Sequence, residues 1–347
     1  MDSTTVYFSF LDKGFEVSSI LAQFSLFGKD ITIRWYGAII AFGFLLAVLW
    51  GGRMAYKWKM NLDKMIDVLI AGTFGGILGA RLYYVIFRWE YYAEHLDEVF
   101  QIWRGGLAIY GGIIGALIAA FIVCKFNKLN FYNLLDCAGM SLLIGQGIGR
   151  WGNFANQEAF GSNTNMPWGM ISEKTTIYLV DHKEELSELG VTVDPYSPVH
   201  PTFLYESLWC LGSFLILLFI YKKCRRFSGQ LFLTYGLLYG TGRAIIEGFR
   251  TDSLYIGSTS LRVSQLLSIV VAAIFLVLLI SLTLKYKKNP KPIEGVDYFP
   301  ADVVKTKKSR KGKASKTDMQ TLAQKRAEKM VKEEEKQEDT ATVETEE

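Results

Sequence analysis

Residues 261–284 read LRVSQLLSIVVAAIFLVLLISLTL, and this stretch decides the class of protein. A helix needs about 20 predominantly apolar residues to cross a bilayer, and this stretch supplies them. The charge pattern changes at its end. Residues 285–347 hold 16 of the 38 Lys+Arg and 13 of the 34 Asp+Glu, which leaves 22 basic and 21 acidic residues in the first 284. That part is only about 15% charged, against roughly a quarter in soluble domains. The composition excludes an ordinary soluble enzyme, a disordered chain and a nucleic-acid binder.

Six more apolar runs resemble this stretch, so the sequence predicts about seven transmembrane helices. The seven runs cover residues 33–51, 66–87, 107–124, 134–148, 203–221, 231–246 and the quoted 261–284. All seven prolines lie outside these runs, which favours unbroken helices. Glycine pairs four residues apart, such as Gly75/Gly79 and Gly111/Gly115, would let such helices approach closely. The predicted fold is an all-α polytopic membrane protein.

Loop charges predict the orientation. Lys and Arg gather in the loops 52–65, 125–133 and 222–230, which alternate with longer loops that are poorer in these residues. The positive-inside rule places the basic loops and the tail in the cytoplasm. With seven spans, the N-terminus then lies outside and the C-terminus inside.

The remaining segments complete the predicted organisation. Residues 1–30 lack the basic start and continuous apolar run of a signal peptide, so we expect an interfacial or extracytoplasmic segment before the membrane domain 31–284. Residues 162–199 would form a small extracytoplasmic arm, with a strand over 171–180. Residues 285–347 alternate basic and acidic blocks and indicate a disordered cytoplasmic tail.

Cysteine and histidine give no sign of a metal site. The four cysteines lie in or beside apolar runs without a C-x-x-C pair, and the three histidines are widely separated. Free cysteine in such positions packs as a small hydrophobe, and the spacing matches no metal-ligand pattern.

Polar clusters interrupt the apolar runs at their outer ends. Residues 145–161, GQGIGRWGNFANQEAFG, carry Arg150, Asn153, Asn156 and Glu158 among small residues. Charged groups in a bilayer are costly, and they mark functional sites by default. An arginine there offers a fork of donors suited to a phosphate. The alternative is a helix end whose arginine and glutamate only pair with each other.

Weaker clusters lie at other span ends. Arg243 and Glu247 are four residues apart, so on a helix they share a face, and Arg250 follows three residues later. Tyr110 stands between two glycine pairs, although a tyrosine at this depth is more often an interfacial anchor. Tyr36 and His200 are single candidates near the first and fifth spans. Together these clusters predict a cavity that opens outward and suits an anionic phospholipid. A transporter or lipid flippase could use the same cavity, but the sequence shows no inverted repeat and no proline-broken span.

The most specific pattern is residues 149–161, GRWGNFANQEAFG. It resembles the signature G-R-x-G-N-F-x-N-x-E-x-x-G of the prolipoprotein diacylglyceryl transferase family. Supporting matches are RWYG at 34–37, GGLAIYGG at 105–112, HPTFLYE at 200–206 and G-x-x-R-x-x-x-E at 240–247. The resemblance covers about residues 30–285.

The resemblance implies an activity, partners and a location. Members move the diacylglyceryl group of phosphatidylglycerol to the lipobox cysteine of a preprolipoprotein signal peptide. The reaction makes a thioether, releases glycerol phosphate and needs no cofactor. The implied location is the bacterial cytoplasmic (inner) membrane, with the active site toward the outer leaflet. The lipid bilayer is a further implied partner, and nucleic acid is not one.

The resemblance also assigns roles to residues. It implies that Arg150 and Arg243 hold the phosphatidylglycerol head group. Further implied site residues are Asn153, Glu158, Gly161, Tyr36, Tyr239, Glu247 and His200. Tyr110 departs from the family pattern, because many members carry a histidine between the glycine pairs. An unperturbed tyrosine has a pKa near 10, so Tyr110 would need nearby positive charge to take the thiol proton. The predicted catalytic set is Arg150, Arg243, Tyr110, Glu158 and Glu247.

Overall fold

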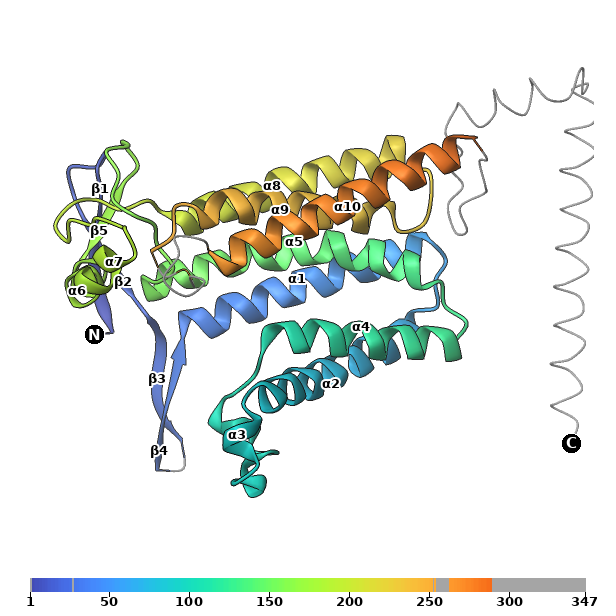
Figure 1. Cartoon of the computed structure of the whole chain (residues 1–347), viewed down its shortest axis with the longest axis horizontal. Helices are drawn as coiled ribbons and strands as arrows, with labels where there is room; N and C mark the ends of the chain where they lie inside the picture. The colour runs from blue at the N-terminus through green and yellow to red at the C-terminus, as the bar shows by residue number, and fades with distance from the viewer. Residues whose placement is uncertain (1, 27, 252, 254–261, 289–347) are drawn as a thin grey trace, which may run out of the picture. The chain divides into compact units, whose positions relative to one another are not determined.

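The structure, a computed structural model, describes residues 2–26, 28–251, 253 and 262–288. Within these ranges the chain is mostly helical, and seven helices of 18 residues or more lie side by side (Figure 1). They are α1 (Trp35–Lys57), α2 (Leu62–Phe87), α4 (Ile109–Phe126), α5 (Phe131–Asn156), α8 (Thr202–Phe219), α9 (Gln230–Glu247) and α10 (Val263–Lys288). Each predicted apolar run lies on one of them. Nearly all of the predicted tail, residues 289–347, lies outside the described residues.

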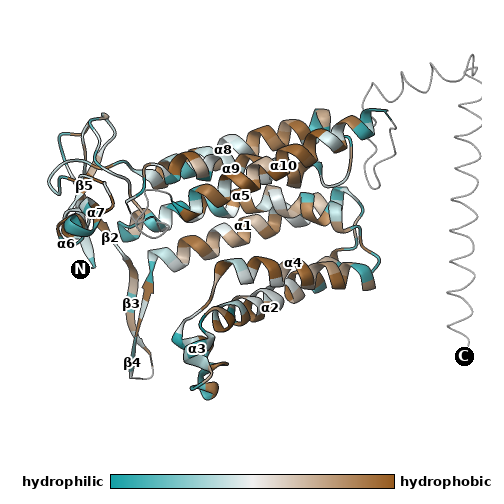
Figure 2. Ribbon diagram, viewed as in Figure 1, coloured by the Kyte–Doolittle hydropathy of each residue, from teal (hydrophilic) through white to brown (hydrophobic). Residues whose placement is uncertain are grey.

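Five of these helices are long and apolar enough to cross a membrane: α1, α2, α4, α10 and α8 extended by the π-helical turn Ile220–Cys224. The prediction of a mainly helical, polytopic membrane protein is therefore confirmed. Hydrophobic residues predominate along the middle of the helices, and hydrophilic residues are more frequent toward their ends (Figure 2). Helices α5 and α9 have lower mean hydropathy because they carry the polar clusters. The same residues that mark a site thus weaken the membrane signal of these two helices.

Helix α5 packs against α1, α8 and α9, whereas α2 and α4 pack mainly on each other. Glycines make the α2–α4 contact possible. A Cβ built on Gly115 would lie 2.2 Å from the carbonyl oxygen of Gly75, and one on Gly79 would lie 2.4 Å from that of Gly111. At these four positions the two backbones touch, so glycine is required by close approach.

Replacing Gly115 with alanine is expected to destabilise the protein by about 1–3 kcal/mol, because the methyl group cannot fit without separating α2 from α4. Gly72→Ala is the matched control on α2, since its Cβ would meet only one atom, at 3.9 Å. Unfolding of the two variants in detergent should differ clearly. Equal stability would show that the two helices separate at little cost.

Short strands and helices lie at the end of the bundle where α1 begins (Figure 1). One antiparallel sheet has the order β2-β1-β5, and β3 and β4 form a hairpin that leads directly into α1. The strands are β1 (Ser3–Phe8), β2 (Phe15–Ser18), β3 (Ile20–Leu26), β4 (Lys29–Arg34) and β5 (Met170–Ser172), and the short helices are α3 (Trp89–Tyr92), α6 (Glu173–Asp181) and α7 (Lys183–Glu188). The expectation of an all-α chain therefore missed two small sheets.

The predicted strand over 171–180 is wrong beyond Ser172. The Ser172 side chain accepts the backbone N–H of Thr175, and the Thr175 hydroxyl accepts the backbone N–H of Ser172. This reciprocal capping box starts α6 at Glu173. The apolar and β-branched residues that suggested a strand instead give α6 a buried face, including Leu179, which packs against Val6 of β1 in a separate small core.

Candidate active site

The polar clusters of α5, α8 and α9 meet at the end of the bundle that carries the strands. Helix α5 continues to Asn156, so Arg150 and Asn153 lie on its last turns rather than in a loop. Gln157 then adopts a left-handed conformation and ends the helix. Because α8 begins and α9 ends at this same level, Arg150, Glu206 and Arg243 face one another.

Glu206 is the centre of the arrangement. Its carboxylate accepts Arg150 Nε at 2.8 Å, Arg243 Nη1 at 3.1 Å and Arg250 Nη1 at 3.3 Å. The Glu206 side chain is only 8% exposed. One buried carboxylate therefore holds three arginines from three segments of the chain, and fixes the directions in which their remaining N–H groups point.

Arg243 is shared between two carboxylates. Its Nη1 reaches Glu206, and its Nη2 lies 2.7 Å from Oε2 of Glu247 one helical turn later. The Glu247 side chain is almost completely buried, at 2% exposed. Arg243 pairs with Glu247 as expected. The same guanidinium also pairs with Glu206, so Arg243 bridges two buried carboxylates.

The side-chain amide of Asn153 connects Arg150 to Glu158, another residue of the signature. Arg150 Nη1 donates to Asn153 Oδ1 at 3.3 Å, and Asn153 Nδ2 donates to Glu158 Oε1 at 2.9 Å. Asn156 also donates to Glu158, at 3.4 Å. Glu158 is exposed to solvent, and Asn153 links it to Arg150. The direct Arg150–Glu158 pair considered from the sequence is not formed.

Gly161 joins the segments that carry the site. Its N–H donates to the carbonyl of His200 at 2.9 Å, and the neighbouring Ser162 N–H donates to that of Phe249 at 2.7 Å. A Cβ on Gly161 would lie 2.7 Å from that of His200 and 2.8 Å from the Phe249 oxygen. The structure therefore places Gly161 where three backbones touch.

Hydrogen bonds connect the side chains of Trp168, Tyr205 and His200 in a row. Trp168 Nε1 donates to the Tyr205 hydroxyl at 2.7 Å, and this hydroxyl lies 2.9 Å from His200 Nδ1. The Tyr205 hydroxyl can donate to Nδ1 or accept from it, so this contact fits either tautomer of His200. Burial lowers the pKa of His200 and favours its neutral form.

The partly buried His200 should make stability depend on pH. Because the folded state holds His200 with a lowered pKa, the unfolded chain takes up the proton first as the pH falls below about 6.5. The free energy of unfolding should therefore rise with pH up to about this value. His200→Gln should flatten that part of the pH profile, and His95→Gln on the exposed α3 connection is the control. An unchanged slope in His200→Gln would contradict the assignment.

The three candidate tyrosines lie in different settings. The Tyr36 ring packs on Gly152 of α5, where a Cβ would lie 2.9 Å from the ring. Tyr239 stacks on Tyr235 within α9, with ring centroids 5.8 Å apart. Tyr110 lies in the first turn of α4 and is 42% exposed. Within the described ranges, no hydrogen bond or ion pair joins Tyr110 to the arginine network.

An apolar cavity of about 590 Å³ adjoins the network between α1, α5 and α8. Trp151, which follows Arg150, lines it and donates to the Ser207 hydroxyl at 3.2 Å. Ser207 itself follows Glu206. The lining of the cavity therefore includes the chain neighbours of Arg150 and Glu206.

Glu206 and Arg250 were not among the predicted site residues. Glu206 stands in the quoted motif at 200–206, at the start of an otherwise apolar run, so the cost of a carboxylate in the bilayer is the signal that could have identified it. Arg250 was noted only as a neighbour of the 243–247 pair. Among the described residues, no group of His, Cys, Asp and Glu is arranged to hold a metal ion.

Comparisons with known proteins show the family of the chain. The sequence model of the family "Prolipoprotein diacylglyceryl transferase" matches residues 23–281. A phosphatidylglycerol–prolipoprotein diacylglyceryl transferase of Finegoldia magna is 42% identical over 266 residues, 77% of this chain and 95% of the relative. The enzyme of the same name from Clostridioides difficile is 40% identical over 71% of this chain and 89% of its own length. That of Staphylococcus aureus strain Newman is 39% identical over 80% and 94%.

Proposed function

The chain belongs to the prolipoprotein diacylglyceryl transferase family, and on that premise we propose how its residues carry out the transfer. It is a membrane transferase that moves the diacylglyceryl group of phosphatidylglycerol to a prolipoprotein, the first step of bacterial lipoprotein maturation. The observation that carries the mechanism is the buried carboxylate of Glu206 bridging three arginines.

In the proposed reaction, the thiolate of the lipobox cysteine attacks the glyceryl carbon next to the phosphate. A carbon–sulfur bond forms, the carbon–oxygen bond to the phosphate breaks, and glycerol phosphate leaves with the bonding electrons. Negative charge grows on the leaving phosphate as that bond lengthens. Arginine forks fixed in advance stabilise such charge most effectively, because they need not reorganise during the reaction.

The network supplies a suitable charge. Three guanidinium groups pair directly with the carboxylates of Glu206 and Glu247, which leaves one positive charge in excess. Arg150 and Arg243 would hold the phosphate, while the two carboxylates keep the forks in position. Asn153, with Glu158 behind it, would orient Arg150.

The apolar cavity between α1, α5 and α8 would hold acyl chain. It is lined chiefly by apolar side chains, and Trp151 and Ser207 mark its end nearest the network. A lipid that placed its phosphate at Arg150 could extend hydrocarbon along the apolar side chains of this cavity, whose lining also includes Arg53. Tyr36 and Tyr239 would contact the head group from the α1 and α9 sides, and His200 from the start of α8.

Tyr110 is the proposed acceptor of the thiol proton, a role that requires an arginine to approach its phenol when the substrates bind. Its exposed position at the start of α4 leaves it accessible to an incoming peptide. Tyr110→Phe is expected to lower kcat by about 10²-fold or more, the usual range for a lost general base. Tyr110→His should retain activity and shift its pH profile downward. Equal activity of the tyrosine and phenylalanine forms would exclude the proposed role.

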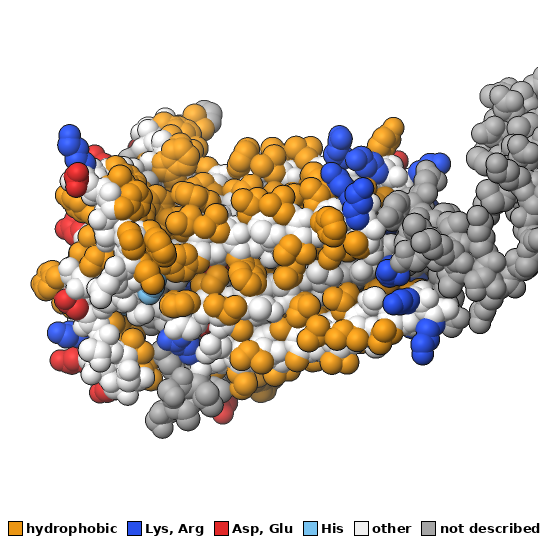
Figure 3. Space-filling view, turned by 90° about the horizontal axis from the view of Figure 1, so that it is seen from above, with side chains coloured by type: hydrophobic (Ala, Val, Ile, Leu, Met, Phe, Trp, Pro, Cys, Tyr) orange, Lys and Arg blue, Asp and Glu red, His pale blue; other side chains and the backbone are white. Residues whose placement is uncertain are grey.

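The proposed orientation places the site toward the outer leaflet. Lys and Arg side chains gather toward the end of the bundle away from the strands (Figure 3). The positive-inside rule makes that end cytoplasmic. With α5 and α9 counted as spans, there are seven crossings, and the small sheet with α6 and α7 forms the extracytoplasmic arm. The implied location is the bacterial cytoplasmic membrane.

Residues 1–30 are proposed to contact the lipid interface through the β3–β4 hairpin. The register pairs Ala22 with Ile33 and Phe24 with Ile31 on one face, and Gln23 with Thr32 on the other. Phe24 and Ile31 are exposed in the protein alone. An exposed apolar face beside the first turn of α1 is suited to the head-group boundary of a bilayer.

The test is an assay with purified protein, phosphatidylglycerol and a lipobox peptide. We expect release of glycerol phosphate together with a gain in peptide mass equal to one diacylglyceryl group. A peptide with alanine in place of the cysteine is the control and should give neither. Release without a cysteine, or no release from folded protein that binds the lipid, would refute the proposed mechanism.

A further inference from the structure

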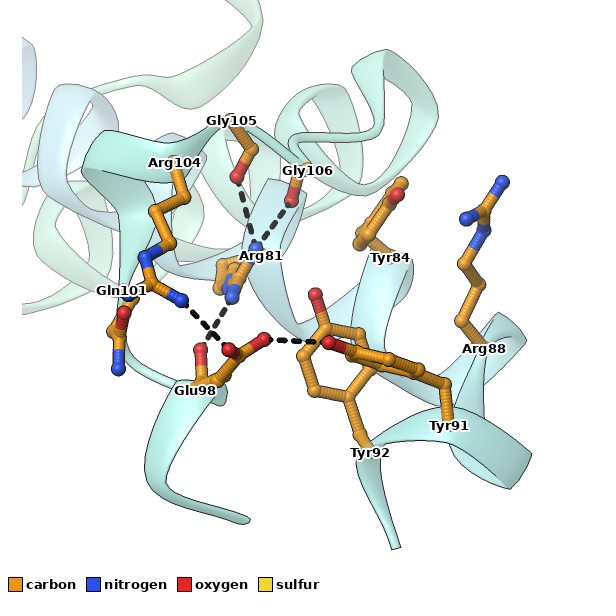
Figure 4. A pocket seen from close by; sticks show the side chains of 10 residues that line it. All are labelled: Arg81, Tyr84, Arg88, Tyr91, Tyr92, Glu98, Gln101, Arg104, Gly105 and Gly106. Atoms are coloured by element: carbon orange, nitrogen blue, oxygen red, sulfur yellow. Dashed lines mark hydrogen bonds and ion pairs between the residues drawn. The ribbon is translucent and has the colours of Figure 1, made fainter. Parts of the chain in front are cut away.

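A polar pocket, separate from the apolar cavity described above, lies on the connection between α2 and α4 and has a volume of about 240 Å³ (Figure 4). Its walls include Arg81, Arg88, Arg104, Tyr84, Tyr91 and Glu98. It is formed by the last turns of α2, by α3 and by the 3₁₀ turns Leu96–Glu98 and Ile102–Arg104. None of these residues belongs to the Glu206 network described above.

Arg81 fixes the shape of the pocket. Its guanidinium donates to the carbonyl oxygens of Val99, Gly105, Gly106 and Glu98 at 2.6–3.1 Å. It is 7% exposed and lies 5.2 Å from the ring centre of Tyr92. Carbonyl dipoles thus stabilise the Arg81 guanidinium, and these hydrogen bonds include no carboxylate that would neutralise its charge. The backbone between α2 and α4 surrounds the charged guanidinium of Arg81.

Glu98 is the one carboxylate among the lining residues of this pocket, and its oxygens are already occupied. Arg104 Nη1 lies 2.6 Å from Oε1, and the Tyr91 hydroxyl donates to Oε2 at 2.8 Å. The hydrogen bond to Glu98 raises the pKa of Tyr91, which keeps the phenol a donor. Glu98 therefore neutralises Arg104 and leaves the charges of Arg81 and Arg88 uncompensated in the pocket wall.

Arg88 has no carboxylate partner among the described residues. Its guanidinium lies 5.3 Å from the ring centre of Tyr84 at the edge of the pocket, and its side chain is exposed. Glu90, Glu94 and Asp97 are on the same connection, but they do not line the pocket. The residues that line the pocket therefore carry two positive charges in excess.

The surroundings of the pocket indicate where its ligand comes from. Large aromatic side chains project from the same connection, with Phe100 80% exposed and Trp103 76% exposed, and Trp89 beside them is also exposed. Aromatic residues at the ends of membrane helices settle at the level of the lipid head groups. A pocket at the level of the head groups lies next to lipid phosphates, which are therefore the nearest anions for it to bind.

We propose that this pocket binds the phosphate of an anionic phospholipid at a site separate from the reacting one. Arg88 and the free N–H groups of Arg104 hold the phosphate, and the Tyr84 hydroxyl supplies a further donor. Arginine suits this role because its planar fork matches phosphate oxygens. The proposal does not depend on the transfer chemistry.

Counting phosphatidylglycerol molecules retained by the purified full chain, by native mass spectrometry, tests the site. Saturated wild-type protein should keep one lipid at the reacting site and a second at this pocket. Arg88→Gln combined with Arg104→Gln should weaken retention of the second lipid by about tenfold or more, as expected for lost charge-assisted contacts. Lys125→Gln combined with Lys128→Gln, two exposed lysines at the other end of α4, is the matched control for two lost charges and should keep both lipids.

Further arms separate the possible outcomes. Phosphatidylcholine should not replace the second lipid, because its head group carries no net negative charge. Equal losses in the lysine control and the arginine double variant, or unchanged retention in the arginine double variant, would overturn the site. Soluble glycerol phosphate that binds the pocket in preference to the lipid would overturn the lipid as its occupant. Transferase activity, measured in parallel, reports on the reacting site alone, so failure of one proposal is not read as failure of the other.

Discussion

Replacing Arg243 with lysine is expected to lower kcat/KM by about 10²- to 10³-fold, the cost of losing one fixed donor to a developing negative charge. The charge remains in this variant, so the effect must come from geometry. Arg243 places Nη1 on Glu206 at 3.1 Å and Nη2 on Glu247 at 2.7 Å. An ammonium group at the end of a flexible chain cannot span both carboxylates and still present a fork to a phosphate.

The loss should appear chiefly in kcat. The proposed clamp is strongest when the leaving phosphate carries its full charge, so the transition state loses more than the bound lipid does. Arg226→Lys, in the loop after α8 and outside the network, is the matched control and should behave as wild type. Thermal unfolding of both variants shows whether the fold is intact. Turnover near the wild-type value in Arg243→Lys would contradict the clamp.

Glu206→Gln tests the same network from its centre. The amide keeps the size of the side chain but cannot neutralise three arginines, so their guanidinium groups should repel one another and separate. We expect a loss at least as large as that of Arg243→Lys. If the carboxylate only neutralised charge without positioning the forks, Glu206→Asp would be as active as wild type. The shorter side chain should instead be strongly impaired.

The sequence predicted the helices well because membrane helices satisfy all of their backbone groups internally and show long apolar runs. It predicted the polar residues of α5 and α9 as a site for the same reason, since charge in such a helix is costly. It did not predict how these residues combine. The role of Glu206 depends on three helices meeting at one level, which no local pattern encodes.

The strands were missed for a different physical reason. Residues 3–8 pair with residues 170–172, far along the chain, so the pattern of either segment alone says little. The strand predicted over 171–180 failed because Ser172 and Thr175 cap a helix there. Short elements at the membrane surface are decided by such local hydrogen bonds and distant pairings rather than by hydropathy.

A second large effect is expected at the opposite end of α5, where Asp136→Ala should destabilise the protein by about 3–5 kcal/mol. Asp136 is fully buried and pairs with Arg225, with Nη2 at 2.8 Å and Nε at 3.2 Å from Oδ2. Its two oxygens also accept the backbone N–H groups of Gly229 and Phe232 at 2.9 Å. One carboxylate thus holds the loop after α8 and caps the first turn of α9.

The cost is large because removing Asp136 leaves a cation behind. The Arg225 side chain is 1% exposed, and its guanidinium lies 4.0 Å from the ring centre of Trp58. Asn133 accepts one of its N–H groups at 2.7 Å but brings no charge. Without Asp136, Arg225 must either remain unpaired in the core or pull the loop open. Unfolding in detergent measures the loss, with the exposed Asp67→Ala expected to stay within about 0.5 kcal/mol of wild type.

A double variant distinguishes an unpaired charge from a lost cap. If the stranded cation dominates, Asp136→Leu with Arg225→Met should recover much of the stability, because apolar replacements of buried pairs are often neutral. If the N–H groups of Gly229 and Phe232 dominate, the double variant should remain as unstable as Asp136→Ala, since neither leucine nor methionine can accept them. We expect partial recovery: the charge is the larger cost, and the uncapped first turn of α9 accounts for the remainder, about 1 kcal/mol.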